Sequence, residues 1–256
     1  MRAASTPAEI LFRIASSLPP TDILHFLGVV DALGHVSVRN PANASQFLMT
    51  FSIAPAQATS KSIVTYEIEN ATAVSLTFNS SVTGASVPTG FSERFIHSEI
   101  LKAFPDVLAV VHGHTEEVLP FANQASVPLV AQIHTHITDN QLHDLLVRNE
   151  LLGDALARKF SNDSQRTGHG MVVRGTSIRD AVFRSYYVKQ NAAAQFQGIL
   201  LGGGRPPKSL SRREATDAST TDDGLVGRAW SLWAQQADNA GLYVNDLRNG
   251  SAPPPT

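Results

Sequence analysis

The feature that most constrains this chain is the alternation of short apolar stretches with longer amphipathic ones between residues 92 and 200. Residues 106–115 (DVLAVVHGHT) and 170–175 (GMVVRG) are apolar runs of strand length, whereas 92–104 and 177–200 have the length and pattern of helices. Strands that alternate with helices in this way are typical of a mixed α/β fold. The chain has 256 residues, of which 43% are hydrophobic and 16% charged, so it can build a sizeable core.

The first third of the chain is predicted to be mostly β, with a hairpin across the Glu69-Asn70 turn. Ser92 is predicted to cap the helix that starts there, and Pro105 follows the end of that helix. The predicted strands are 33–41, 47–53, 62–69, 73–78, 106–115, 127–137 and 170–175. The predicted helices are 8–18, 92–104, 141–160, 177–200 and 225–241, with a short helix or turn at 117–124.

The C-terminal fifth of the chain begins with a stretch rich in Gly, Pro, Ser and Thr, which is typical of a loop or linker. We therefore expect a first domain over residues 1–200 and an irregular loop over 201–224. Residues 225–256 are expected to form a helix and a tail that pack on the same domain.

Composition excludes several classes of function. There is no cysteine, so disulfides and thiolate metal sites are excluded, and a metal must rest on His, Asp or Glu. A net charge of −2 gives no global field for nucleic acid or an anionic membrane. No apolar run approaches the ~20 residues needed to span a bilayer, and prolines interrupt the N-terminal stretch, so we expect a cytoplasmic protein.

Histidines give the sequence its clearest chemical signal. His112 and His114 end an apolar strand, and residues i and i+2 of a strand point to the same face. Two imidazoles presented this way can share a metal ion about 2 Å from each nitrogen. Without further context, the pair is equally consistent with two polar residues at the end of a strand that bind no metal. His169 adds weight because it lies between two glycines before another apolar strand, and close backbone approach is possible there.

These residues stand in segments that resemble the class II aldolase/adducin domain family, in family order over roughly residues 8 to 200. The matching segments are GHVSVRNP (34–41), SERFIH (92–97), PDVLAVVHGHTEEVLPFA (105–122) and GHGMVVRGTSIRDAVFRSYYVKQNA (168–192). The resemblance implies a three-layer α/β/α sandwich around a mainly antiparallel central sheet. It also implies a homo-oligomer, a tetramer in many members, with active sites at subunit interfaces.

The resemblance further implies that His112, His114 and His169 are zinc ligands and that Glu93 is the acid/base residue. Zinc would act as a Lewis acid on a substrate oxygen, and three imidazole ligands leave Fe²⁺ or Mn²⁺ as alternatives. Without the motif, Glu93 would be read as an ordinary first-turn residue that complements the helix dipole.

A polar stretch, SNDSQRTGHG, stands where the family has an apolar strand before the third histidine. If His169 does not reach the metal, His134 or His136, which share the His-x-His spacing, are the candidates to replace it.

Two departures from the family bear on the substrate. Phe91-Ser92 stands where sugar-phosphate aldolases have a Ser-Ser pair that binds phosphate, and no TPSG-like phosphate loop follows the first strands. A non-phosphorylated carbonyl or keto-acid substrate therefore fits better. His35, Ser92 and Tyr243 are the candidate substrate-binding residues; Tyr243 would act in a neighbouring subunit's site, with a packing role as the alternative.

Together these features predict a metal-dependent carbon–carbon lyase that acts by aldol or retro-aldol cleavage, or by decarboxylation, through a metal-stabilised enolate. The alternatives are an epimerase, a dehydratase or an iron oxygenase on the same scaffold, or a non-catalytic, adducin-like interaction module. The expected partner is a small-molecule carbonyl compound. Segments such as VRGTSIRDAVFRSYYVKQNA also resemble fungal class II aldolase-like proteins, which implies a place in secondary metabolism.

Overall fold

The computed structural model describes residues 20–122, 146–160, 170–244 and 246. The predicted helix 8–18 and the predicted strand 127–137 lie outside these residues. No helix in the described part of the chain is long and apolar enough to cross a membrane.

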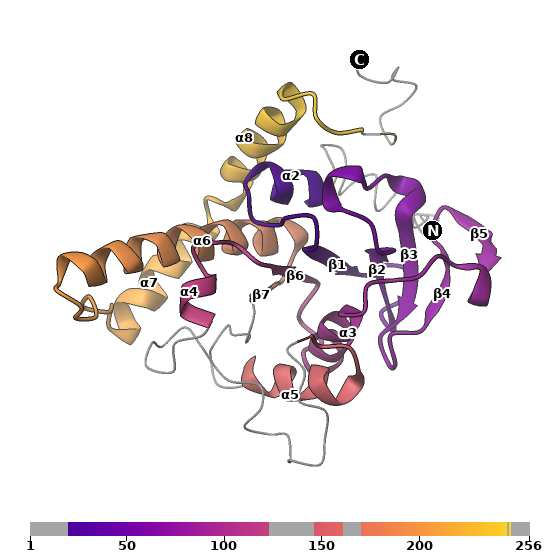
Figure 1. Ribbon diagram of the computed structural model, residues 1–256, viewed down its shortest axis with the longest axis horizontal. Coiled ribbons are helices and arrows are strands. Elements are labelled where there is room, and N and C mark those ends of the chain that lie inside the picture. Colours follow the sequence, from indigo (N-terminus) through magenta and orange to yellow (C-terminus); the bar gives the residue numbers. More distant parts are fainter. Residues whose placement is uncertain (1–19, 123–145, 161–169, 245, 247–256) are drawn as a thin grey trace, which may run out of the picture.

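A single seven-stranded sheet forms the centre of the structure (Figure 1), in the order β5-β4-β3-β2-β1-β6-β7. Every pair of neighbouring strands is antiparallel, which confirms the predicted mainly antiparallel sheet. The hairpin predicted across Glu69-Asn70 is the β3–β4 pair. The strands are β1 (His35–Arg39), β2 (Gln46–Thr50), β3 (Ile63–Glu67), β4 (Ala73–Leu76), β5 (Asn79–Thr83), β6 (Ala109–Gly113) and β7 (Met171–Gly175).

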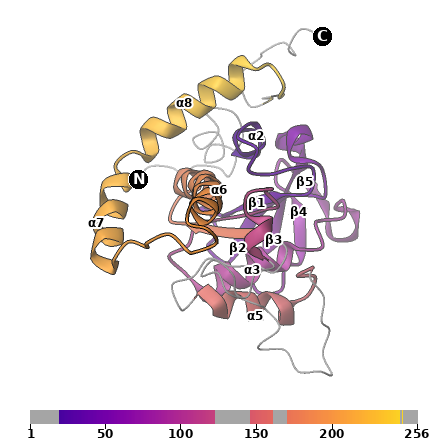
Figure 2. The ribbon, with the colours of Figure 1, turned by 60° about the vertical axis from the view of Figure 1, so that its left-hand side comes forward.

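Helices cover both faces of the sheet, so the predicted three-layer sandwich is confirmed (Figures 1 and 2). One layer contains α2 (Pro20–Phe26), α6 (Ile178–Leu201) and α8 (Val226–Asn239), which share one core cluster. The other contains α3 (Arg94–Ala103) and α5 (Glu150–Phe160), which pack against each other and share a second cluster. The remaining elements are short: α4 (Leu119–Ala122), η1 (Pro55–Gln57), η2 (Ser60–Ser62) and η3 (Gly84–Ser86).

The two-residue period of the strands decides which side chains face which helical layer. In β6, Ala109 and Val111 belong to the core under α2, α6 and α8, whereas Val110 belongs to the core under α3 and α5. The same alternation turns His112 toward the α3 layer. Val36 of β1 faces the α6 layer, so its neighbours His35 and Ser37 also face α3.

The segment predicted as an irregular loop instead contains a helix, α7 (Arg212–Asp223). Sequence periodicity does not reveal α7, because it is polar on all sides and has no apolar stripe to bury. A capping box starts the helix: the Ser211 hydroxyl accepts from the Glu214 backbone N–H at 3.2 Å, and the Glu214 carboxylate accepts from the Ser211 N–H at 2.7 Å. These hydrogen bonds lower the pKa of Glu214. The Ser-x-x-Glu pattern of this capping box is the sequence signal from which α7 could have been predicted.

Two other predicted boundaries were wrong. The helix predicted over 141–160 begins at Glu150, because the Asn149 side chain accepts the Leu152 backbone N–H at 2.9 Å and caps it there. The helix predicted to be capped by Ser92 has Glu93 at the N-cap position and begins at Arg94. The final helix was predicted correctly, and Trp230 and Trp233 of α8 are buried in the core shared with α6.

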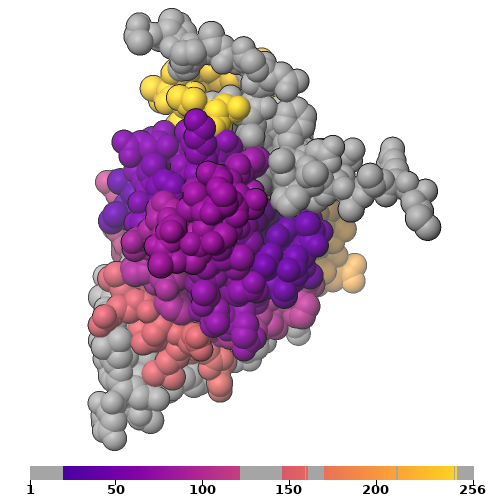
Figure 3. Space-filling model, turned by 90° about the vertical axis from the view of Figure 1, so that its right-hand side faces the viewer, coloured from indigo at the N-terminus to yellow at the C-terminus, as the bar shows by residue number. Residues whose placement is uncertain are grey.

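Figure 3 shows the side of the molecule where the N-terminal half of the chain is most exposed. Strand β5 at this edge is largely exposed, with a shifted register against β4. The histidine-bearing strands β1 and β6 lie inside the sheet, and every residue of β6 is buried.

A buried carboxyl group makes stability depend on pH. Asp22 of α2 has no exposed surface, and within the described chain its carboxylate oxygens have no hydrogen-bond partner. Burial raises the pKa of Asp22 from 3.8 to about 8. Between these values the folded state keeps a proton that the unfolded state releases, so the free energy of unfolding falls as the pH rises through this window.

We therefore expect Asp22→Asn to remove part of the pH dependence of stability. The contribution of Asp22 changes by at most about 1.4 kcal/mol per pH unit inside the window. Urea unfolding of both proteins at about pH 5 and about pH 7 should show the wild type losing up to roughly 2.7 kcal/mol more than the variant. Equal losses in the two proteins would contradict the assignment.

Candidate metal centre

Strand register brings two histidines together. β1 and β6 are antiparallel neighbours, and His35 is the direct cross-strand partner of His112. Both side chains are almost completely buried, at 2% and 0% exposure, and their ring centroids lie 5.0 Å apart. His114 follows His112 at the strand exit, on the same face. The two imidazoles of the His-x-His pair thus lie side by side, and β1 adds a third imidazole.

Helix α3 supplies the carboxylate of the site. Glu93, at the N-cap of α3, is 7% exposed, and its Oε2 lies 3.5 Å from His112 Nε2 and 3.7 Å from His35 Nε2. Its Oε1 accepts the Val147 backbone N–H at 3.4 Å. One ligand atom from each of His35, Glu93 and His112 lies within 4.8 Å of the other two, so this group could hold a metal ion. The start of a helix also favours the charged carboxylate.

The rings of His112 and His114 meet through their Nε2 atoms. His112 Nδ1 lies 3.0 Å from the Met171 carbonyl oxygen, which can only accept, so the ring hydrogen is on Nδ1 and Nε2 carries a lone pair. His114 Nδ1 faces Asp31 Oδ1 at 3.6 Å, an ion-pair distance at which a hydrogen on Nδ1 is attracted to the carboxylate. The two Nε2 atoms lie 3.0 Å apart. With the hydrogen on Nδ1 of both rings, the two Nε2 lone pairs would repel at this distance unless a cation lay between them.

The donor set fits a divalent metal. Two nitrogens bound to one zinc ion at about 2.0–2.1 Å in tetrahedral geometry lie roughly 3.3 Å apart, close to the observed separation. A carbonyl or carboxylate oxygen behind each imidazole is the usual support for a metal-binding histidine. Close packing holds this geometry, because a Cβ on Gly170 would lie 2.9 Å from the His114 ring and 2.6 Å from the Gly113 carbonyl oxygen.

Asp31 is a functional candidate that sequence reasoning missed. It lies in the loop between α2 and β1, and its Oδ1 accepts the backbone N–H groups of Leu33 and Gly34, both at 2.9 Å. Partial burial raises its pKa, but these hydrogen bonds and His114 outweigh burial, so the pKa of Asp31 lies below its usual value. A lone Asp in a loop gives no sequence signal, because only the fold brings it to His114.

Behind His35 lies a second pair of buried polar side chains. His35 Nδ1 lies 2.7 Å from His97 Nε2, and His97 Nδ1 lies 2.7 Å from the Ser37 hydroxyl. Burial lowers the pKa of His97 well below its usual value, so the ring is neutral. His97 is completely buried and contacts His35. Ser37 was missed, although its spacing of two from His35 places it on the same face.

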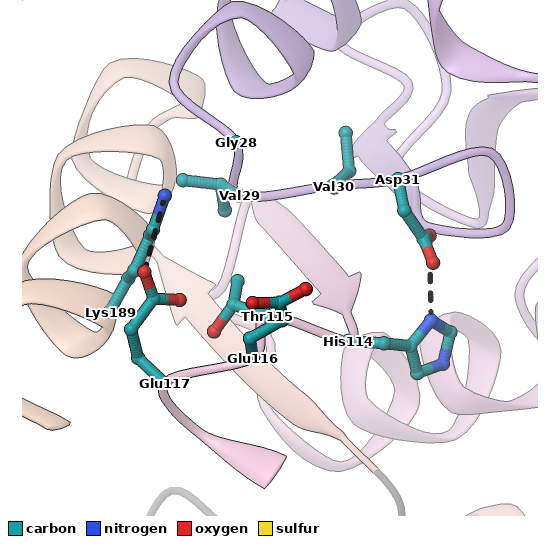
Figure 4. Close-up of a pocket in the computed structure, with 9 residues that line it drawn as sticks. All are labelled: Gly28, Val29, Val30, Asp31, His114, Thr115, Glu116, Glu117 and Lys189. Carbon is teal, nitrogen blue, oxygen red and sulfur yellow. Dashed lines mark ion pairs between the residues drawn. The ribbon is translucent and has the colours of Figure 1, made fainter. Parts of the chain in front are cut away.

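A cleft opens beside His114 (Figure 4). Its volume is about 340 Å³. It is lined by Gly28, Val29, Val30, Asp31, His114, Thr115, Glu116, Glu117 and Lys189. Lys189 of α6 crosses its far end, donating to the Leu27 carbonyl at 3.0 Å and pairing with Glu117 at 3.7 Å. The cleft contains three carboxylates and one ammonium group, so it is a poor place for a phosphate dianion.

The other predicted site residues have different positions. Ser92 is exposed. Tyr243 is buried in the core under α2 and α8, where its hydroxyl lies 2.9 Å from His25 Nδ1, and burial raises its pKa to about 12. These contacts fit the packing alternative, and its role in a neighbouring subunit stays a prediction. His169, His134 and His136 lie outside the described residues.

The fold and the site define a three-layer α/β/α protein with a histidine–carboxylate cluster on one face of an antiparallel sheet. The family model described as "Class II Aldolase and Adducin N-terminal domain" matches residues 22–196. The chain belongs to the class II aldolase/adducin family, as the sequence motifs predict.

Comparison with individual proteins agrees with this assignment. The chain is 34% identical over 257 residues to decarboxylase tropJ of Talaromyces stipitatus, covering 87% of this chain and 93% of that protein. Its fold is similar to an aldolase II superfamily protein from Pseudomonas syringae, with a TM-score of 0.70, 17% identity, and coverage of 94% and 96% of the two chains. L-fuculose 1-phosphate aldolase from Glaciozyma antarctica gives a TM-score of 0.63 at 18% identity, covering 94% of each chain.

Proposed function

We propose that this protein is a carbon–carbon lyase that acts next to a carbonyl group, by decarboxylation or by aldol or retro-aldol cleavage. The main support is the position of a buried carboxylate: Glu93 Oε2 lies 3.5 Å from His112 Nε2, which in turn lies 3.0 Å from His114 Nε2. Membership of the class II aldolase/adducin family and 34% identity to a decarboxylase support a lyase.

In this proposal His112 and His114 hold a divalent metal, with His169 as the third ligand inferred from the family motif. Zinc is the metal that an all-imidazole set suits best, with Fe²⁺ and Mn²⁺ as alternatives. When bound, the metal supplies a Lewis acid that stabilises negative charge as it develops on a substrate oxygen. A cluster buried this deeply is expensive to keep without a ligand, which argues against a purely structural module.

Glu93 moves the proton in the proposed reaction. When the bond beside the carbonyl breaks, its electron pair stays on the carbon next to the carbonyl, and that carbon must then gain a proton. Protonated Glu93 gives that proton in the cleavage direction, and the carboxylate takes it in the synthetic direction. Because Oε1 is held by the Val147 N–H, Oε2 is the oxygen directed at the imidazoles and the reacting atoms.

The surroundings favour a substrate without phosphate. The Phe91 ring packs on His35 with centroids 4.7 Å apart, so an apolar wall stands where sugar-phosphate aldolases of the family bind phosphate. The cleft beside His114 carries three carboxylates and one lysine. We propose a carbonyl or keto-acid substrate of secondary metabolism, converted by a cytoplasmic homo-oligomer.

Replacing Glu93 tests the proposed chemistry. Turnover is measured by mass spectrometry on β-keto acids, 2-hydroxybenzoic acids and β-hydroxy ketones, each beside a sugar phosphate. We expect turnover of the unphosphorylated compounds, and we expect Glu93→Gln to lower kcat by about 100- to 10,000-fold because the proton transfer is lost. Glu99→Gln, on the same helix and also buried, is the control and should stay near the wild-type kcat. Full turnover by Glu93→Gln would overturn the assignment.

Metal content tests the ligand set independently of any substrate. We expect one equivalent of zinc in the wild type after dialysis against zinc, and almost none in His112→Gln. Asp31→Asn should bind zinc about 10- to 100-fold more weakly, because His114 loses the carboxylate behind it. Asp217→Asn in the exposed helix α7 is the control. Wild-type protein that binds no zinc, iron or manganese would reject the metal site.

A further inference from the structure

Three buried polar side chains form a hydrogen-bonded chain that ends in the site. Ser37 and His35 come from β1 and His97 comes from α3, and their exposures are 1%, 2% and 0%. The two links, Ser37 Oγ to His97 Nδ1 and His97 Nε2 to His35 Nδ1, are both 2.7 Å long. Such short, water-free links fix which nitrogen of each ring carries its hydrogen.

The hydrogens of this chain can point in only two directions, because His97 is neutral and carries one ring hydrogen. In the first, the Ser37 hydroxyl donates to His97 Nδ1, His97 Nε2–H donates to His35 Nδ1, and the hydrogen of His35 is on Nε2. In the second, both links reverse, and His35 Nε2 carries a lone pair. The second leaves the buried Ser37 hydroxyl hydrogen with no acceptor among the described residues, which costs free energy.

The His35 end of this hydrogen-bonded chain also favours the first of the two directions. His35 Nε2 faces Glu93 Oε2 at 3.7 Å, where an N–H is attracted to the carboxylate and a lone pair is repelled. His112 and His114 differ from His35, because an oxygen atom lies behind each Nδ1, at 3.0 Å in His112 and at 3.6 Å in His114, and favours the hydrogen there and the lone pair on Nε2. The cluster therefore contains two nitrogens that can bind a metal and one that can donate a hydrogen bond.

The geometry points to His35 as a hydrogen-bond donor to a substrate oxygen, held in that tautomer by His97 and Ser37, and not as a metal ligand. The substrate and the metal in this statement rest on the proposed function. A nitrogen of His35 and one of His112 lie within 4.8 Å of each other, so a substrate must present two oxygens close together. A hydroxy acid or keto acid meets this requirement, one oxygen directed at the metal and the other at His35.

Zinc affinity distinguishes between His35 as a hydrogen-bond donor and His35 as a metal ligand. Isothermal titration of metal-free protein with zinc compares the wild type, His35→Gln and His112→Gln. We expect His35→Gln to keep the wild-type affinity to within about threefold and His112→Gln to lose it by at least roughly 100-fold. An equal loss in the two variants would make His35 a ligand and overturn the inference. A wild type that does not bind zinc would instead reject the proposed metal site.

The tautomer is measured directly by ¹⁵N spectra of histidine-labelled protein, with the His35 signals assigned from their absence in His35→Gln. We expect the hydrogen of His35 on Nε2 in both the metal-free and the zinc-loaded wild type. Ser37→Ala should change the ratio of His35 tautomers by about three- to tenfold, the effect of one lost hydrogen bond. Ser98→Ala, a buried serine beside His97 in α3, is the matched control. A hydrogen on Nδ1 of wild-type His35, or equal spectra for the two serine variants, would overturn the inference.

Discussion

The pairing of β1 with β6 is the constraint on which the rest of the site depends. The register sets His35 opposite His112, and the two-residue period turns both toward α3 while Val36 and Val111 fill the core on the other side. A slip of one residue would exchange the buried imidazoles for valines. The apolar residues that stabilise the sheet therefore also determine the position of the polar cluster.

The groups that lie behind the imidazoles determine which nitrogen of each ring carries the hydrogen. The Met171 carbonyl lies behind His112 Nδ1, and the Asp31 carboxylate lies behind His114 Nδ1. Both groups can only accept hydrogen bonds, so they favour the ring hydrogen on Nδ1 and the lone pair on Nε2. Ser37, acting through His97, has the opposite effect on His35. His35, His112 and His114 thus differ in the proposed roles of their Nε2 atoms, because different groups lie behind the three rings. His97 is buried and neutral, so it links Ser37 to His35 without adding charge.

The fold class, most of the described elements and the His112/His114 pair could be predicted from the sequence, because apolar periodicity and strand spacing are local signals. Helix α7 has no apolar stripe and was missed, although its capping box was readable. The cap at Glu93 instead of Ser92 shifts a boundary by one residue, which local patterns do not resolve. Asp31 and the His97–His35 contact are tertiary, since they join segments that only the folded chain brings together.

In the proposed site, His112 and His114 direct two lone pairs at one divalent cation beside Glu93. Anomalous X-ray diffraction from zinc-loaded crystals, recorded on both sides of the zinc edge, measures this directly. We expect one peak about 2.0–2.1 Å from Nε2 of His112 and of His114, with His35 Nε2 outside bonding distance. A peak elsewhere, no peak between the two imidazoles, or a zinc bound by His35 would contradict it.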